Sequence, residues 1–114
     1  MKIKDMRMWT TGIEVDYGYA GNNKNGWSAR CNWRCKIIGQ EGYIDGEMKT
    51  PYRKTIGQAI DEILILMNKF DIKKCNESHN MKFYLYIDEE SDPSEEVINK
   101  MKSEAKRRGW EHCF

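Results

Sequence analysis

The sequence predicts an α+β fold in the order β-β-β-α-β-α, in which an antiparallel meander is followed by a fourth strand and two helices pack against the sheet. Two patterns predict it. Apolar and polar residues alternate in four stretches, as in strands with one buried face, and apolar residues recur at helical spacing in two others. Short runs rich in Gly or Asn separate the first three stretches, as hairpin loops do.

Length and charge narrow the class of protein. The chain has 114 residues, so we expect a single domain over 1–114. Its 19 basic and 18 acidic residues nearly cancel, which gives no overall attraction to a long nucleic acid or a membrane. The opening MKIKDMRMWTTG carries charges throughout, and no run is apolar for the length of a membrane span. We therefore expect a cytoplasmic protein.

The first three strands are predicted at about 5–17, 27–38 and 43–49. The second is the clearest, because Trp27, Ala29 and Cys31 share one parity while Arg30 and Arg34 share the other. This strand therefore has a core face and a polar face that carries two arginines.

The same strand decides what its cysteines can do. At about 3.3 Å per residue, Cys31 and Cys35 lie roughly 13 Å apart, whereas a disulfide needs Cα atoms within about 7 Å. They can neither pair with each other nor share one zinc ion. Cys75 and Cys113 show no metal-binding spacing either. We expect reduced thiols, with Cys31 and Cys35 as small buried residues, and no metal site.

The first helix is predicted at about 56–70, where Thr55 and Gln58 form a capping box ahead of an apolar stripe. Its run ILILM at 63–67 is apolar almost all round. A helix of this kind is covered on more than one side, which favours a homo-oligomer.

The fourth strand is predicted at about 81–88 and the second helix at about 93–108. Asp92 is the expected N-cap, and Pro93 is expected at the first helical position. Arg107 and Arg108 close the helix with positive charge.

Phosphate binding is the chemistry that these residue types favour. Arginine matches two phosphate oxygens with its planar fork, and Arg30 and Arg34 form one pair and Arg107 and Arg108 another. Tyr84 lies on the polar parity of its strand, where an exposed ring can stack on a base. A small, neutral domain with these features predicts a compact nucleotide ligand.

Catalysis has no such support. Ser28, Ser78 and Ser91 lack the setting of a catalytic serine, and no glycine-rich phosphate loop is present. We expect a binding protein that is not an enzyme and uses no cofactor.

The order of elements resembles the core of the RNase H-like fold, including HicB-type antitoxins that retain part of it. The nuclease resemblance implies carboxylates that hold two divalent metals, for which Asp16 and Asp88 stand near strand ends. Asp61 and Glu62 lie on the first helix but outside the motif of the enzymes. A HicB-like protein-binding module is therefore the main alternative, and a metal-dependent nuclease is a weaker one.

The opening MKIKDMRM…GIEV, the strand-rich first half and the two-helix second half resemble the small phage proteins that counter the bacterial Thoeris system. The resemblance implies a homo-oligomeric sponge, dimeric or higher, that acts in the infected bacterial host. It implies that the protein sequesters a cyclic ADP-ribose isomer without hydrolysing it, through aromatic rings on the base and arginines on the pyrophosphate. With Arg34 from the polar face, the expected ligand-binding residues are Arg30, Arg34, Phe83, Tyr84, Arg107 and Arg108.

Overall fold

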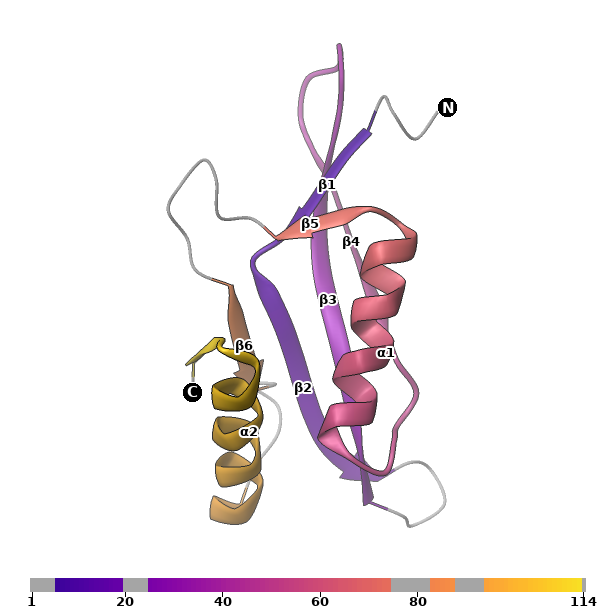
Figure 1. Cartoon of the computed structure of the whole chain (residues 1–114). Helices are drawn as coiled ribbons and strands as arrows, with labels where there is room; N and C mark the ends of the chain where they lie inside the picture. The colour runs from indigo at the N-terminus through magenta and orange to yellow at the C-terminus, as the bar shows by residue number, and fades with distance from the viewer. Residues whose placement is uncertain (1–5, 20–24, 75–82, 88–93, 114) are drawn as a thin grey trace.

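The computed structural model describes residues 6–19, 25–74, 83–87 and 94–113, in which seven strands form one mixed sheet and two helices pack against it (Figure 1). The predicted α+β class is confirmed. That the whole chain is one domain stays a prediction. The elements are β1 (Met6–Thr10), β2 (Gly12–Tyr19), β3 (Asn25–Ile37), β4 (Ile44–Lys49), α1 (Ile56–Lys69), β5 (Ile72–Lys74), β6 (Tyr84–Ile87), α2 (Glu95–Arg108) and β7 (Glu111–Cys113).

The long strand β3 is the centre of the sheet. One of its edges pairs antiparallel with β4, and the other pairs antiparallel first with β2 and then with β1. The predicted meander is therefore present as β2, β3 and β4. Strand β5 joins β1 in parallel, while β6 joins β2 in parallel and is itself followed by β7.

The first predicted strand, 5–17, is in fact two strands separated by a β-bulge. Between the pairs Trp9↔Arg34 and Ile13↔Cys31, the first chain segment advances by four residues and β3 by three. One extra residue on one strand bends it and re-aims the neighbouring side chains. The sheet also divides here, because β5 pairs with the segment before the bulge and β6 with the segment after it.

Gly12 allows the chain to make this junction. A Cβ at this position would lie 2.2 Å from the carbonyl oxygen of Tyr84 and 2.5 Å from the ring of Tyr86. On the other side of the bulge, the buried hydroxyl of Thr10 donates to the carbonyl of Asn32 at 2.6 Å. Only a glycine therefore permits β6 to lie this close to β2.

The helices pack on one face of the sheet and enclose the core. Ile13 and Leu85 of the sheet, Ile60 of α1 and Met101 of α2 are all 0% exposed and belong to one apolar cluster. Helix α1 begins at the predicted capping box: Gln58 donates its backbone N–H to the Thr55 hydroxyl at 3.1 Å, and its side chain accepts the Thr55 N–H at 3.1 Å. No helix within the described ranges is long and apolar enough to cross a membrane.

The second helix begins later than predicted. Ser94 is the N-cap and accepts the backbone N–H of Val97 at 3.3 Å, so the assignment of the cap to Asp92 and of the first helical position to Pro93 was wrong. Serine and aspartate are equally good N-caps, and Ser94 follows Asp92 by only two residues. Asp92 and Pro93 themselves lie outside the described residues.

Two short strands were not predicted. Strands β5 and β7 have three residues each, which is too short for an alternating pattern to be recognised. The fourth predicted strand, 81–88, is described as β6 over Tyr84–Ile87, and residues 81, 82 and 88 lie outside the described ranges.

Candidate functional site

The sheet has a polar face on the side away from the helices. Side chains alternate between the two faces of a strand, so the residues next to the buried ones point to the opposite side. We call this side the open face. Its residues on β1, β2 and β3 include Trp9, Glu14, Asp16, Arg30, Asn32 and Arg34, and those on β4 and β6 are Asp45, Glu47, Lys49, Tyr84 and Tyr86.

The bulge makes a hollow in the sheet, which we call the open-face groove. Its larger part, about 570 Å³, crosses β1, β3 and β4 and is lined by Trp9, Thr10, Thr11, Asn32, Trp33, Arg34, Asp45, Gly46 and Glu47. A smaller hollow of about 230 Å³ shares Thr10, Thr11 and Asn32 with it and extends to Gly12, Glu14 and Tyr86. The two adjoining hollows together touch five strands, β1, β2, β3, β4 and β6.

Arg34 lies in the larger part of the groove and is held by a carboxylate. Its Nε lies 2.8 Å from Oδ1 of Asp45, and its second nitrogen donates to Oδ2 at 3.3 Å. The guanidinium carbon also lies 5.3 Å from the ring centroid of Tyr43. The hydrogen bond from Arg34 lowers the pKa of Asp45, and the same bond raises the pKa of Arg34. Arg34 thus already presents its fork to an anion at the surface.

Arg30 lies beside the smaller hollow and has acidic neighbours on both sides. It donates to the carboxylate of Glu14, and its Nε lies 3.8 Å from a carboxylate oxygen of Glu47. The amide of Asn32 donates to the other oxygen of Glu14 at 3.1 Å. The groove therefore combines cations with carboxylates and is not strongly positive.

Aromatic rings stand on the open face at both ends of the groove. Tyr84 and Tyr86 lie side by side with ring centroids 5.6 Å apart. At the other end, the rings of Trp9 and Tyr43 meet edge to face at 5.7 Å. Such rings on a sheet surface are suited to stacking against a nucleobase.

The structure separates the six predicted ligand-binding residues into two groups. Arg30, Arg34 and Tyr84 lie on the open face, with Arg34 lining the groove itself. The remaining three lie on the helix side of the sheet or at the end of α2: Phe83, Arg107 and Arg108.

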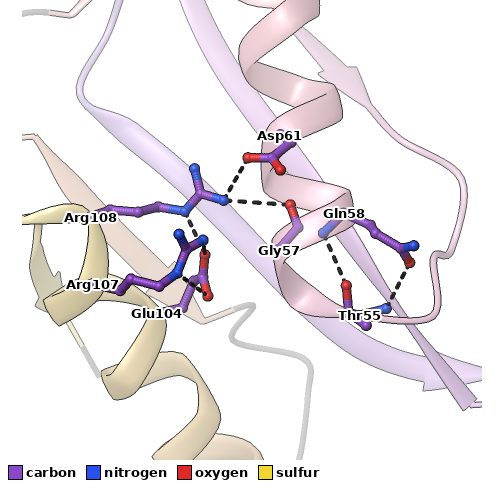
Figure 2. A network of polar contacts seen from close by, with 7 residues as sticks. All are labelled: Thr55, Gly57, Gln58, Asp61, Glu104, Arg107 and Arg108. Carbon is purple, nitrogen blue, oxygen red and sulfur yellow. Dashed lines mark hydrogen bonds and ion pairs between the residues drawn. The ribbon is translucent and has the colours of Figure 1, made fainter.

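Arg108 ties the two helices together (Figure 2). Its side chain is only 11% exposed, and it donates to Glu104 at 2.6 Å and to Asp61 of α1 at 2.7 Å. Arg107 also donates to Glu104 but remains 62% exposed. Burial raises the pKa of Glu104, but the hydrogen bonds from the two arginines outweigh it, so that the pKa is lowered overall. Arg108 also donates to the carbonyl of Gly57 at 3.5 Å and lies 5.4 Å from the centroid of the Trp110 ring, so its guanidinium is engaged in contacts within the fold.

Phe83 is part of the core edge. Its ring packs edge to face on Trp110 at 5.1 Å, and Lys74 lies 4.7 Å from the centroid of the Phe83 ring. Its neighbour Tyr84 points to the opposite face of the sheet, as alternation requires.

The two cysteines of β3 are free and buried, as predicted. Burial raises the pKa of the Cys31 thiol. Cys75 and the side chain of Cys113 lie outside the described residues. Within the described ranges, no group of three or more His, Cys, Asp or Glu side chains is placed to hold a metal ion.

The acids of the nuclease resemblance are only partly described. Asp16 accepts a hydrogen bond from the hydroxyl of Tyr52, and Asp61 accepts one from the guanidinium of Arg108. Glu62 binds Arg53 through two contacts of 2.6 and 2.7 Å. Asp88 lies outside the described residues.

Several residues of the groove were not expected from the sequence as site residues: Trp9, Asn32, Asp45 and Glu47. Asn32, Asp45 and Glu47 lie on the polar parity of their strands. Trp9 shares the parity of Ile13 and Val15 in the sequence and was expected on the core face, but the bulge shifts the alternation and places it on the open face. The one local signal is Thr10-Thr11-Gly12, which interrupts the alternation of the first predicted strand.

No family model, no curated protein and no solved structure matches this chain.

Proposed function

We propose that the protein binds and sequesters a cyclic ADP-ribose-type nucleotide signal without hydrolysing it, and so blocks an anti-phage defence in the cytoplasm of an infected bacterium. The defence and the identity of the signal rest on the resemblance to the anti-Thoeris proteins. The ligand class rests on the open-face groove.

One observation carries the proposal: a single recess holds an arginine fork, aromatic rings and carboxylates. Arg34 has the donor geometry for pyrophosphate oxygens. Trp9 and Tyr86 line the two parts of the groove and offer rings to a base. Glu47 and Glu14 are acceptors for ribose hydroxyls or for the amino group of a base.

Asp45 occupies the position of the anion on Arg34. A pyrophosphate group offers the same two-oxygen geometry, so it can replace the Asp45 carboxylate on the guanidinium. Asp45 then competes with the ligand, and its removal strengthens binding. Stronger binding after removal of an acid distinguishes this site from a simple basic patch.

Retention of the ligand follows from how the groove would bind it. Contacts to the ground state of the pyrophosphate and the base lower the free energy of the complex but do not favour a transition state. A site of this kind stores its ligand, and we propose that the protein is not an enzyme.

Isothermal titration calorimetry with cyclic ADP-ribose isomers and linear ADP-ribose tests this proposal. Arg34→Ala should weaken binding about tenfold to a hundredfold, the effect of losing hydrogen bonds to a charged group. Asp45→Asn should strengthen binding, and Arg107→Ala on the helix side should leave it unchanged. Binding that depends on Arg107 and Arg108 but not on Arg34 would place the ligand on the helix side instead.

A second candidate is a protein-binding module of the HicB-like kind. We propose a homo-oligomer for both candidates. The observation that favours it is the outer surface of α1, where Ile65 is 68% exposed and Phe70 beside the helix end is 48% exposed. Exposed apolar side chains on a helix are common docking points. The calorimetry separates the two, because a protein-binding module shows no heat of binding with any of the nucleotides.

A further inference from the structure

Strand β4 is the edge strand of the meander. It pairs with β3, and no other strand in the described part of the chain pairs with it. Its six residues, IDGEMK, contain no proline. An edge without proline is a template on which another strand can pair.

The backbone groups that point out from this edge can be identified. Thr50 donates its N–H to the carbonyl of Ala29 at 2.9 Å, which continues the β3–β4 pairing by one step. Because hydrogen-bonding residues alternate along an antiparallel pair, the N–H and C=O groups of Asp45, Glu47 and Lys49 point away from β3. These three residues are the ones that a partner strand would meet.

The outward groups are complementary to themselves. In a two-fold antiparallel pairing centred on Glu47, Asp45 of each copy lies opposite Lys49 of the other, and all three residues exchange backbone hydrogen bonds. The two Glu47 side chains face each other, and each has Arg30 at 3.8 Å to offset the repulsion.

The helix side of the same pairing also fits. Met48 of one copy would lie opposite Gly46 of the other. The Trp33 ring covers this glycine so closely that a Cβ there would lie 2.1 Å from it. Met48 would therefore meet an indole ring, a favourable sulfur–aromatic contact. One register thus serves the backbone, the charges and the apolar side chains.

We propose that two copies of the chain pair through β4, edge to edge and antiparallel about Glu47, into one continuous sheet. The pairing deepens the proposed homo-oligomer and does not depend on the ligand. Because Asp45, Gly46 and Glu47 also line the open-face groove, the β4 strand of the second copy lies beside that groove. The two open-face grooves of the dimer therefore lie next to each other across the two-fold axis.

Light scattering coupled to size-exclusion chromatography tests the interface on the ligand-free protein. The wild type should have at least the mass of a dimer at micromolar concentration. Lys49→Glu should break this interface and so halve the measured mass, because it places Glu opposite Asp45. Glu47→Pro should do the same, because it removes an outward N–H that no strand of the described fold uses.

Two further variants complete the test. Asp45→Lys combined with Lys49→Glu should restore the wild-type mass, since it reverses the charges of the pair. Lys106→Glu, at an exposed position of α2, should leave the mass unchanged. Circular dichroism checks that each variant is folded. A monomeric wild type would overturn the proposal. An oligomer insensitive to Lys49→Glu and Glu47→Pro would put the interface elsewhere, and failure of the double variant would reject the register.

Discussion

At the scale of single residues, Arg108 links the two helices through an acid on each of them. It donates to Glu104 of its own helix and to Asp61 of α1 while only 11% exposed. Arg108→Ala should lower the free energy of unfolding by about 2 kcal/mol, because charged hydrogen bonds are lost and the buried Glu104 carboxylate keeps, among the residues that the structure describes, only Arg107 as a partner. Urea denaturation measures this loss.

The matched control is its neighbour. Arg107→Ala removes a side chain that binds the same Glu104 but is 62% exposed, so we expect a much smaller change. Equal losses in the two variants would contradict the assignment of Arg108 as the tie between the helices.

Cys31 is a packing residue. Its side chain is 0% exposed, and burial raises the pKa of its thiol, so the reactive thiolate is disfavoured. We expect no alkylation of Cys31 in the folded protein and full alkylation in urea. Cys31→Ala should cost about 1 kcal/mol of stability, as is usual for a small loss of volume in a core. Peptide mass spectrometry detects the labelled site, and rapid labelling of the folded protein would refute the packing role.

At the scale of elements, the junction of β2 and β6 depends on Gly12. A methyl group at this position would meet the Tyr84 carbonyl at 2.2 Å, so Gly12→Ala should separate the strands and lower the melting temperature. The control is Gly57→Ala in the first turn of α1, where the nearest atom to the added carbon is 3.8 Å away. That variant should stabilise the protein by about 0.5 kcal/mol because alanine favours the helix. Thermal melting that ranks the two variants the other way would contradict this account of the bulge.

The stability contributed by Glu104 of α2 should depend on acid pH. The bonds from Arg107 and Arg108 leave the pKa of Glu104 lower in the folded protein than in the unfolded chain, despite the opposing effect of burial. Stability from this group is therefore fully present above its unfolded pKa of about 4.3 and is lost as the pH falls through the folded pKa. Glu104→Gln should flatten the dependence of unfolding free energy on pH below about 4.5, where carboxylates titrate. Urea melts across this range provide the comparison, and parallel curves for the two proteins would count against the network.

At the scale of the molecule, the sequence reveals the faces of the sheet better than the shape of the site. Trp27, Ala29 and Cys31 are buried as alternation predicts, because the two-residue period is a local property of a strand. The capping box of α1 is equally local. The groove is not, since it needs a bulge opposite Asn32 and the arrival of β6 beside Gly12.

The arginines illustrate the same limit. Arg34 and Arg108 both lie within two residues of a tryptophan in the sequence, yet one lies in an exposed groove and the other between the helices. The acid that fixes Arg108, Asp61, is 47 residues away in the chain, and its pairing depends on how α2 packs on α1. Residue type therefore predicted phosphate-binding chemistry, while tertiary packing decides which arginines are available for it.

The central claim is that the protein holds a cyclic ADP-ribose-type signal and does not cleave it. Its most direct test is to incubate the protein with the cyclic nucleotide and Mg²⁺, remove unbound ligand by filtration, denature the protein by heat and identify the released molecule by mass spectrometry. We expect the intact cyclic nucleotide from the wild type and much less of it from Arg34→Ala. Linear or cleaved product that forms only with Mg²⁺ would instead favour the nuclease-like alternative that involves Asp16, and no retained nucleotide at all would contradict the claim.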